Sequence, residues 1–337
     1  MENFVDKAHD KDPWVVEFSL ISVEATVDMN PEHRTLNTEH SLLRVWFLAA
    51  RPKTLWAGIA PVLMGSALAY SAGGFHAGAA VAALLGALLI QVGTNFCNDY
   101  ADFKKGADTQ DRVGPVRVTQ AGWVAPEAML RATVLVFLAA ALVGVYLVLR
   151  GGWPMFWIAA FSILLGVAYT AGPFALAYLG LGDVFVLIFF GPIAVGGTYY
   201  VQTLEWPLYV TMAGLAPGLL SCAVLAVNNL RDLDQDRAAG KRTLAVRFGR
   251  SFARAEYVFC VCAACLAVPI ILWLGFAMTP AILLSVAVLP VGVPSMKAVV
   301  SGRAGPTLNP VLGRTAFLLL IFALLFTSGL FLGTLLV

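Results

Sequence analysis

The chain has 337 residues, of which 59% are hydrophobic and only 12% charged, and its formal net charge is +2. Soluble globular domains are typically about 45–50% apolar and about 25% charged, so this composition excludes an ordinary soluble protein. It predicts a protein that crosses a membrane many times, and the small net charge gives no reason to expect a nucleic-acid partner.

Residues 1–42 form a polar segment that holds nine of the twenty acidic residues and no long apolar run. The segment lacks the basic start and apolar stretch of a signal peptide, so we expect a flexible extension on the cytoplasmic side. We expect residues 43–337 to form a single transmembrane domain.

From Leu43 onward, apolar stretches of spanning length alternate with short polar interruptions. A membrane-spanning helix needs about 20 predominantly apolar residues. The expected fold class is therefore an all-α integral membrane protein with about nine transmembrane helices in one bundle. The expected spans are residues 52–71, 77–97, 127–149, 153–171, 181–201, 208–228, 255–275, 278–297 and 315–336.

The basic residues test this number of spans, because loops rich in Lys and Arg stay on the cytoplasmic side. With the N-terminus in the cytoplasm, all but one of the 22 Lys and Arg residues fall on that side, and the exception is Arg150. We therefore expect a multi-pass protein of the cell membrane, whose N-terminus and charged loops are cytoplasmic.

Two short segments after the second and sixth spans hold most of the remaining acidic residues, and both begin alike. Asn98 stands four residues before Asp102, and Asn228 stands four residues before Asp232. Residues four apart share one face of a helix, so each pair is expected on one side of a helical end. Asp236 continues the second series by four further residues.

Carboxylates gathered in this way repel one another unless a cation neutralises them, and Mg²⁺ prefers such hard oxygen ligands. Acidic groups for a metal beside basic groups for phosphate are typical of a metal–diphosphate site. The alternative is a pair of solvated loops whose charges only fix the topology. The acidic residues of these two segments include Asp102, Asp108, Asp232 and Asp236, and their basic residues include Lys105, Arg112, Arg117 and Lys241.

The segments NDYADFKKGADTQDRVGPVRVTQAG (98–122) and NNLRDLDQDRAAGKRTLAVRFG (228–249) resemble the two aspartate-rich motifs of the UbiA superfamily of intramembrane prenyltransferases. The resemblance covers the chain from about Ser41 to its end, including nine helices with motifs after helices two and six. It implies a Mg²⁺-dependent transfer of a long isoprenyl chain from its diphosphate to an aromatic ring. The resemblance also implies that the magnesium ligands are Asp102, Asp108, Asp232 and Asp236. The implied direct contacts to the diphosphate are Arg112, Arg117 and Lys241, and Lys105 is a further expected substrate-binding residue.

Further runs resemble the branch of this family that prenylates 1,4-dihydroxy-2-naphthoate for menaquinone synthesis. These are the Gly106–Asp108 ending, the run Arg112–Val113–Gly114–Pro115, the run Arg51–Pro52–Lys53–Thr54 and FFGPIAVGGTYYVQ (189–202). The 4-hydroxybenzoate branch usually has a shorter first motif, whose last Asp would fall at position 106, where this chain has Gly. The implied partners are a polyprenyl diphosphate, 1,4-dihydroxy-2-naphthoate and the lipid bilayer.

The resemblance and the chemistry together suggest roles for the other polar residues. Asn98 and Asn228 can orient metal, water or phosphate oxygens, and the aromatic ring of Tyr169 can shield the allylic cation. Tyr169 is equally well explained as an interfacial tyrosine.

Arg51 or Lys53 can hold the carboxylate of the acceptor, although a topological anchor explains both equally well. Asp183 lies in the otherwise nearly uncharged loop LGLGD on the same side. It is a further candidate for substrate binding, and no general base is evident from the sequence.

Two other functions remain open. The same fold can prenylate another aromatic acid, such as homogentisate or 4-hydroxybenzoate. A transporter or channel can also use intramembrane carboxylates, but carriers place them near the middle of the membrane, whereas here they stand at helix ends and in loops.

Overall fold

The computed structural model describes residues 41–106, 114–172 and 175–335, and every regular element in these ranges is helical. Eight helical stretches within them are long and apolar enough to cross a bilayer, which confirms the prediction of an all-α membrane protein. The elements are α2 (Leu42–Ala50), α3 (Pro52–Ser71), α4 (Ala77–Lys104), α5 (Pro126–Ala168), α6 (Leu176–Leu179), α7 (Gly182–Ile188), η2 (Phe189–Ile193), α8 (Ala194–Thr203), α9 (Leu208–Arg231), α10 (Leu233–Ala238), α11 (Leu244–Cys262), η3 (Ala263–Ala267), α12 (Val268–Phe276), η4 (Pro280–Val288), α13 (Leu289–Val300), η5 (Gly305–Leu308) and α14 (Asn309–Leu335).

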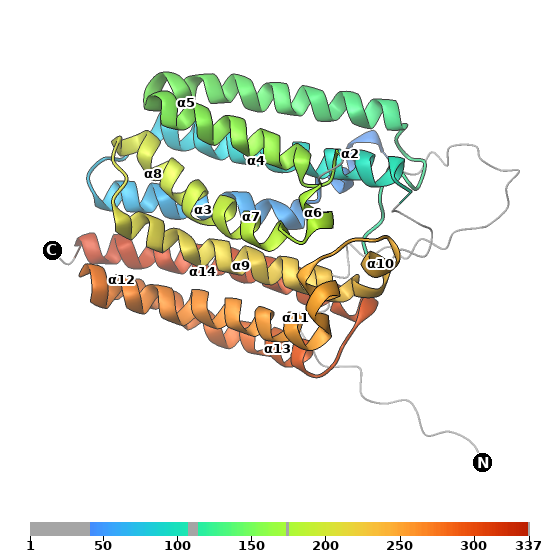
Figure 1. Ribbon diagram of the computed structural model, residues 1–337. Coiled ribbons are helices and arrows are strands. Elements are labelled where there is room, and N and C mark those ends of the chain that lie inside the picture. Colours follow the sequence, from blue (N-terminus) through green and yellow to red (C-terminus); the bar gives the residue numbers. More distant parts are fainter. Residues whose placement is uncertain (1–40, 107–113, 173–174, 336–337) are drawn as a thin grey trace, which may run out of the picture. The chain divides into compact units, whose positions relative to one another are not determined.

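Helix α5 accounts for two of the nine expected spans. It is 43 residues long, or about 65 Å at 1.5 Å per residue, roughly twice the thickness of the hydrocarbon layer. Gly152 interrupts it with φ 67° and ψ −154°, a conformation that glycine adopts readily. Figure 1 shows the ribbon of α5 doubling back on itself. The expected spans 127–149 and 153–171 are therefore two antiparallel arms joined almost without a loop.

The start of α11 differs from the sequence-based expectation, which placed the next span at residue 255. The helix begins at Leu244, because the hydroxyl of Thr243 accepts a hydrogen bond from the amide of Val246 and caps it. Gly249 then bends the chain with φ 84°, so a short basic helical turn precedes the long apolar arm. The cap at Thr243 therefore starts the helix within a basic segment that its composition predicted to be a loop.

Helix α9 is the central element and packs against η2, α11 and α14. Its contact with η2 depends on glycine, because a Cβ atom at Gly214 would lie 2.7 Å from Pro192 Cα and one at Gly218 would lie 2.5 Å from the carbonyl oxygen of Leu187. Small residues allow such close backbone approach between membrane helices. The contact fixes α7 beside α9, and with it the polar residue Asp183 at the start of α7.

Candidate active site

A polar cavity of about 130 Å³ lies where the ends of α4, α5, α9 and α10 meet the start of α7. Its wall includes residues from both aspartate-rich segments, which are far apart in the sequence. Most of the residues singled out from the sequence line it. These are Arg51, Asn98, Asp102, Arg117, Tyr169, Asp183, Asn228, Asp232, Asp236 and Lys241.

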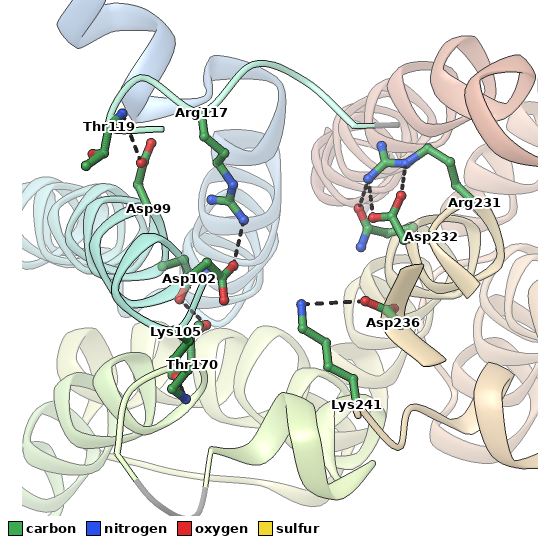
Figure 2. Close-up of polar contacts among 12 residues, drawn as sticks. Asp99, Asp102, Lys105, Arg117, Thr119, Thr170, Arg231, Asp232, Asp236 and Lys241 are labelled. Carbon is green, nitrogen blue, oxygen red and sulfur yellow. Dashed lines mark hydrogen bonds and ion pairs between the residues drawn. The ribbon is translucent and has the colours of Figure 1, made fainter. Parts of the chain in front are cut away.

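The first wall is built by the end of α4 and the loop that follows it. Asp102 is only 4% exposed, and one of its oxygens, Oδ2, accepts a hydrogen bond from Arg117 Nη2 at 3.0 Å. Asp99, for which the sequence pattern predicts no role, accepts a hydrogen bond from the backbone amide of Thr119 at 3.2 Å. Asp99 thus holds the loop in the position that brings Arg117 to Asp102 (Figure 2).

The second wall is formed where α9 ends and α10 begins, with Asp232 at the junction. The guanidinium of Arg231 donates two hydrogen bonds to Asp232, from Nε to Oδ1 at 2.7 Å and from Nη2 to Oδ2 at 2.6 Å. The same side chain also donates to Asn228 Oδ1 at 2.8 Å and to Asn309 Oδ1 at 3.0 Å. This fork of Arg231 is buried and fixes the orientation of Asp232 and Asn228.

Asp236 lies on the same wall, one helical turn beyond Asp232, and faces Lys241 at 3.5 Å (Figure 2). Burial raises the pKa of Asp236 to about 6, although the ammonium of Lys241 opposes this shift. Asp232 and Asp102 raise the pKa further, because their negative charges face the same cavity. A carboxylate that is poorly solvated and near other carboxylates favours the approach of a cation.

Tyr169 and Thr170 close the cavity from the turn after α5. Burial, followed by the charge of Asp183, raises the pKa of Tyr169 well above its usual range, so the side chain is a neutral phenol. The Thr170 hydroxyl donates a hydrogen bond of 2.5 Å to Asn98 Oδ1. This contact ties the turn that carries Tyr169 to the end of α4.

Lys105 is a predicted substrate-binding residue that does not line this cavity. Its Nζ donates to the carbonyl oxygen of Thr170 at 2.6 Å and lies 4.5 Å from the centre of the Tyr178 ring. Lys241 Nζ lies 5.4 Å from the same ring centre. Tyr178, which the sequence did not single out, thus interacts with two lysines next to the cavity.

A second, apolar cavity of about 380 Å³ adjoins the polar one. The two share five lining residues, and Lys53 lines only the apolar cavity. Along α4 the apolar cavity extends from Asn98 to Ala83, about 22 Å at 1.5 Å per residue. Its far end is lined by Leu147 and Met155, near the turn between the two arms of α5. The shared residues are Arg51, Asn98, Tyr169, Leu225 and Asn228.

The polar cavity suits a magnesium ion shared with a substrate better than a closed metal site. In the part of the chain that the structure describes, no three acidic, His or Cys side chains form a metal-binding group by themselves. Magnesium is usually held by one or two carboxylates together with waters and substrate phosphates. Asp102 on one wall and the pair Asp232 and Asp236 on the other fit that arrangement (Figure 2).

Two of the expected site residues, Asp108 and Arg112, lie outside the described residues. Arg231 and Asn309 are the clearest omissions of the sequence-based reasoning. The only signal for Arg231 was its position directly before Asp232, whereas its contact with Asn309 joins residues 78 positions apart.

Comparisons with known proteins identify the family. The family model described as "UbiA prenyltransferase family" matches residues 58–305. A 1,4-dihydroxy-2-naphthoate octaprenyltransferase of Haemophilus influenzae is 37% identical over 303 residues, which cover 86% of this chain and 97% of the relative. The protein of that name in Mycobacterium tuberculosis is 36% identical over 293 residues, covering 86% of this chain and 98% of its own length.

Solved structures show the same fold. The structure of a UbiA homolog from Archaeoglobus fulgidus superposes with a TM-score of 0.58 at 13% identity, covering 85% of this chain and 99% of that one. A structure of a UbiA homolog from the same organism bound to DMAPP and Mg²⁺ superposes with a TM-score of 0.50 at 15% identity, covering 83% and 98%. From the family model and the long alignments with close relatives, we conclude that this chain belongs to the UbiA prenyltransferase family.

Proposed function

We propose that the protein transfers a polyprenyl chain from its diphosphate to 1,4-dihydroxy-2-naphthoate, with loss of CO2 and diphosphate, as a step of menaquinone biosynthesis. Similarity over nearly the whole length of several 1,4-dihydroxy-2-naphthoate octaprenyltransferases supports this acceptor. The observation that carries the reaction type is the direct junction of a polar cavity, lined by both aspartate-rich segments, with a long apolar cavity.

The polar cavity is the proposed site for the diphosphate. Magnesium held by Asp102, Asp108, Asp232 and Asp236 would neutralise the charge that develops on the diphosphate as the allylic carbon–oxygen bond breaks. The proposed direct contacts to the diphosphate come from basic side chains, whereas Lys105 acts by holding the turn at Thr170. These basic residues are Arg112, Arg117 and Lys241.

The junction of the cavities is the proposed place of reaction. Asn98 and Asn228 line both cavities and orient the diphosphate at the boundary, while Tyr169 presents its ring to the allylic carbon. A neutral aromatic ring stabilises a nearby cation through its π face without being alkylated as readily as a phenolate. Arg51 and Lys53, at the start of α3, are placed to hold the acceptor's carboxylate.

The orientation in the membrane is also part of this proposal. The protein is a multi-pass membrane protein, and we place the mouth of the polar cavity, the N-terminus and the polar segment 1–42 in the cytoplasm, with the cell membrane as its location. The one-sided distribution of Lys and Arg supports that orientation. It allows a charged head group to enter from the cytoplasm while the tail stays in an apolar environment.

An acceptor assay on the purified full-length protein tests the function. Octaprenyl diphosphate and Mg²⁺ are supplied with 1,4-dihydroxy-2-naphthoate, homogentisate or 4-hydroxybenzoate, and diphosphate release and product mass are measured. We expect prenylated, decarboxylated product from the naphthoate only, and none when EDTA removes the metal. Product from another acid would identify that acid as the acceptor in place of the naphthoate. Absence of product with all three acids, in a membrane preparation that contains the folded protein, would contradict the reaction type.

A further inference from the structure

Among the described residues, Asp183 is the one acidic side chain of the polar cavity that belongs to neither aspartate-rich segment. It stands in the first turn of α7 and is 8% exposed. Its carboxyl group hydrogen bonds to the carboxyl group of Glu256, a half-buried residue of α11. Two acids from different helices therefore meet at the edge of the proposed site.

A hydrogen bond between two carboxyl groups needs a proton between them, because an ionised carboxylate can only accept. Asp183 Oδ1 is sealed from solvent, and the residue's own backbone N–H also donates to the carboxyl group. Cys222 Sγ donates to the carbonyl oxygen of Asp183 at 3.3 Å and not to its carboxyl group. At least one of the two carboxyl groups therefore carries a proton.

Both neutral and charged groups surround the pair at pH 7, and the neutral ones are a phenol and two thiols. The neutral groups are Tyr169 of the turn after α5, Cys222 of α9 and Cys260 of α11. The charged groups that line the polar cavity together with Asp183 are Arg51, Asp102, Arg117, Asp232, Asp236 and Lys241.

Asp183 is also adjacent to the ring that we place at the reacting carbon. A Cβ atom at Gly182, the residue directly before Asp183, would lie 3.3 Å from Tyr169 Oη. Tyr169 and Asp183 therefore lie close together in the wall of the polar cavity. In the proposed reaction the aromatic acceptor lies beside Tyr169, with its ring hydroxyl group toward Asp183.

We propose that Asp183 is the proton acceptor for the hydroxyl group of the aromatic substrate, and that Glu256 is a positioning residue that holds Asp183 in its reactive form. This inference rests on the proposed function. It supplies the proton-accepting group for which the sequence offered no candidate. Glu256 acts through Asp183, because it does not line either cavity.

The proton and electrons balance within one turnover. As the ring carbon attacks the allylic carbon, the carbon–carbon bond forms, the ring hydroxyl becomes a carbonyl, and its proton moves to Asp183. Loss of CO2 then breaks the bond between the ring and the carboxylate, and that electron pair restores the aromatic ring. The carbonyl oxygen becomes a hydroxyl again by taking the proton back from Asp183. The pair ends the cycle as it began.

The contribution of Glu256 is its hydrogen bond. A donor stabilises the ionised form of the carboxylate that accepts from it, whereas burial without a donor favours the protonated form. Asp183 must be ionised to accept a proton. Glutamine at position 256 has a shape similar to that of glutamate and keeps a hydrogen-bond donor. Leucine has a similar volume but no hydrogen-bond donor.

Three variants of the full-length enzyme test the pair. Asp183→Asn should lower kcat by about 100-fold or more, since general-base catalysis contributes about 10²–10⁴-fold. Glu256→Leu should move the acid limb of the kcat–pH profile up by about one pH unit or more, because Asp183 then needs a higher pH to ionise. Glu256→Gln should leave the limb near its wild-type position. Glu205→Gln, an exposed acid between α8 and α9, is the control.

Binding of a non-reacting prenyl thiolodiphosphate with Mg²⁺ serves as the readout for an intact fold and should stay within about twofold of wild type in each variant. The inference is overturned if Asp183→Asn retains more than a tenth of wild-type kcat, or if Glu256→Leu and Glu256→Gln have the same profile. If Glu256→Leu does not fold, the kcat of Asp183→Asn alone tests the proposal. Failure of the wild type to prenylate any aromatic acid is a different result and contradicts the proposed function itself.

Discussion

Asp232 and Arg231 are neighbours in the chain and are also a buried, doubly hydrogen-bonded ion pair. Removing one member of such a pair leaves the other charge buried without compensation, which typically costs about 3–5 kcal/mol. Truncation to alanine therefore mixes a loss of stability with a loss of chemistry. Asparagine keeps the shape and an acceptor for Arg231 and removes only the charge.

Asp232→Asn should lower kcat by about 100-fold or more, because a neutral amide is a far weaker magnesium ligand than a carboxylate. Asp234→Asn is the matched control: Asp234 lies two residues away, and its side chain is 71% exposed and paired with Arg250 at the surface. We expect that control within about twofold of wild type. Diphosphate release at saturating Mg²⁺ measures both, and equal effects of the two substitutions would contradict the assignment.

Tyr169 gives a second test at the scale of one side chain. If its ring stabilises the allylic cation, Tyr169→Phe keeps that interaction and should retain activity within about threefold. Tyr169→Leu removes it, and a cation–π contribution of about 0.5–2 kcal/mol corresponds to a rate loss of roughly 2- to 30-fold. Single-turnover rates separate this effect from product release. A large loss in the phenylalanine variant would instead assign the role to the hydroxyl group.

The sequence identifies the residues of this site better than it identifies their partners. The spacing of Asn228, Asp232 and Asp236 predicts a common face, and all three line one cavity. The contact of Arg231 with Asn309 and that of Asp183 with Glu256 depend on how distant helices pack, which no local pattern contains.

The same contrast holds for whole helices. Hydropathy and length predict the spans closely, and the first of them, 52–71, coincides with α3. The two arms of α5 were expected as separate spans, yet helical geometry is interrupted only at Gly152. The early start of α11 at Leu244 was not expected, because the capping hydroxyl of Thr243 changes local structure without changing hydropathy.

Helix α5 also offers a test of the apolar cavity. Gly144 lines that cavity near its far end, and a Cβ atom there would meet only the Ala159 side chain, at 3.7 Å. Gly144→Leu should fill the far end, so that turnover of octaprenyl diphosphate falls while that of geranyl diphosphate stays near wild type. Gly275→Leu, on an exposed position of α12 with its nearest atom at 4.0 Å, is the control. Equal losses for both donors would contradict this placement of the tail.

At the scale of the whole molecule, one basic residue departs from the one-sided distribution of Lys and Arg, and the structure explains why. Arg150, at the opposite end from the charged loops, donates from Nε to the Val201 carbonyl oxygen at 2.7 Å and from Nη2 to that of Gln202 at 3.1 Å. These are carbonyls of the last turn of α8, where a cation is favourable. Arg150 thus caps a helix end, so it does not argue against the orientation drawn from the other basic residues.

Labelling from one side of the membrane tests that orientation. Cysteine is introduced at Ala239, exposed after α10, or at Ala72, exposed after α3, in a background without the five native cysteines. In intact cells, a membrane-impermeant thiol reagent should label Ala72→Cys and leave Ala239→Cys unlabelled. Inside-out vesicles should give the reverse. Labelling of Ala239→Cys from outside would invert the proposed topology.

In the proposed binding mode, the five residues shared by the two cavities define where the donor reacts. The bound diphosphate sets the position of the carbon atom attached to it. For a donor bound as proposed, that carbon therefore lies at this junction whatever the length of the tail. Donors of different length then differ only in how far they reach toward Leu147 and Met155. The site of bond formation and the length of the chain become independent properties, so one can change in evolution without disturbing the other.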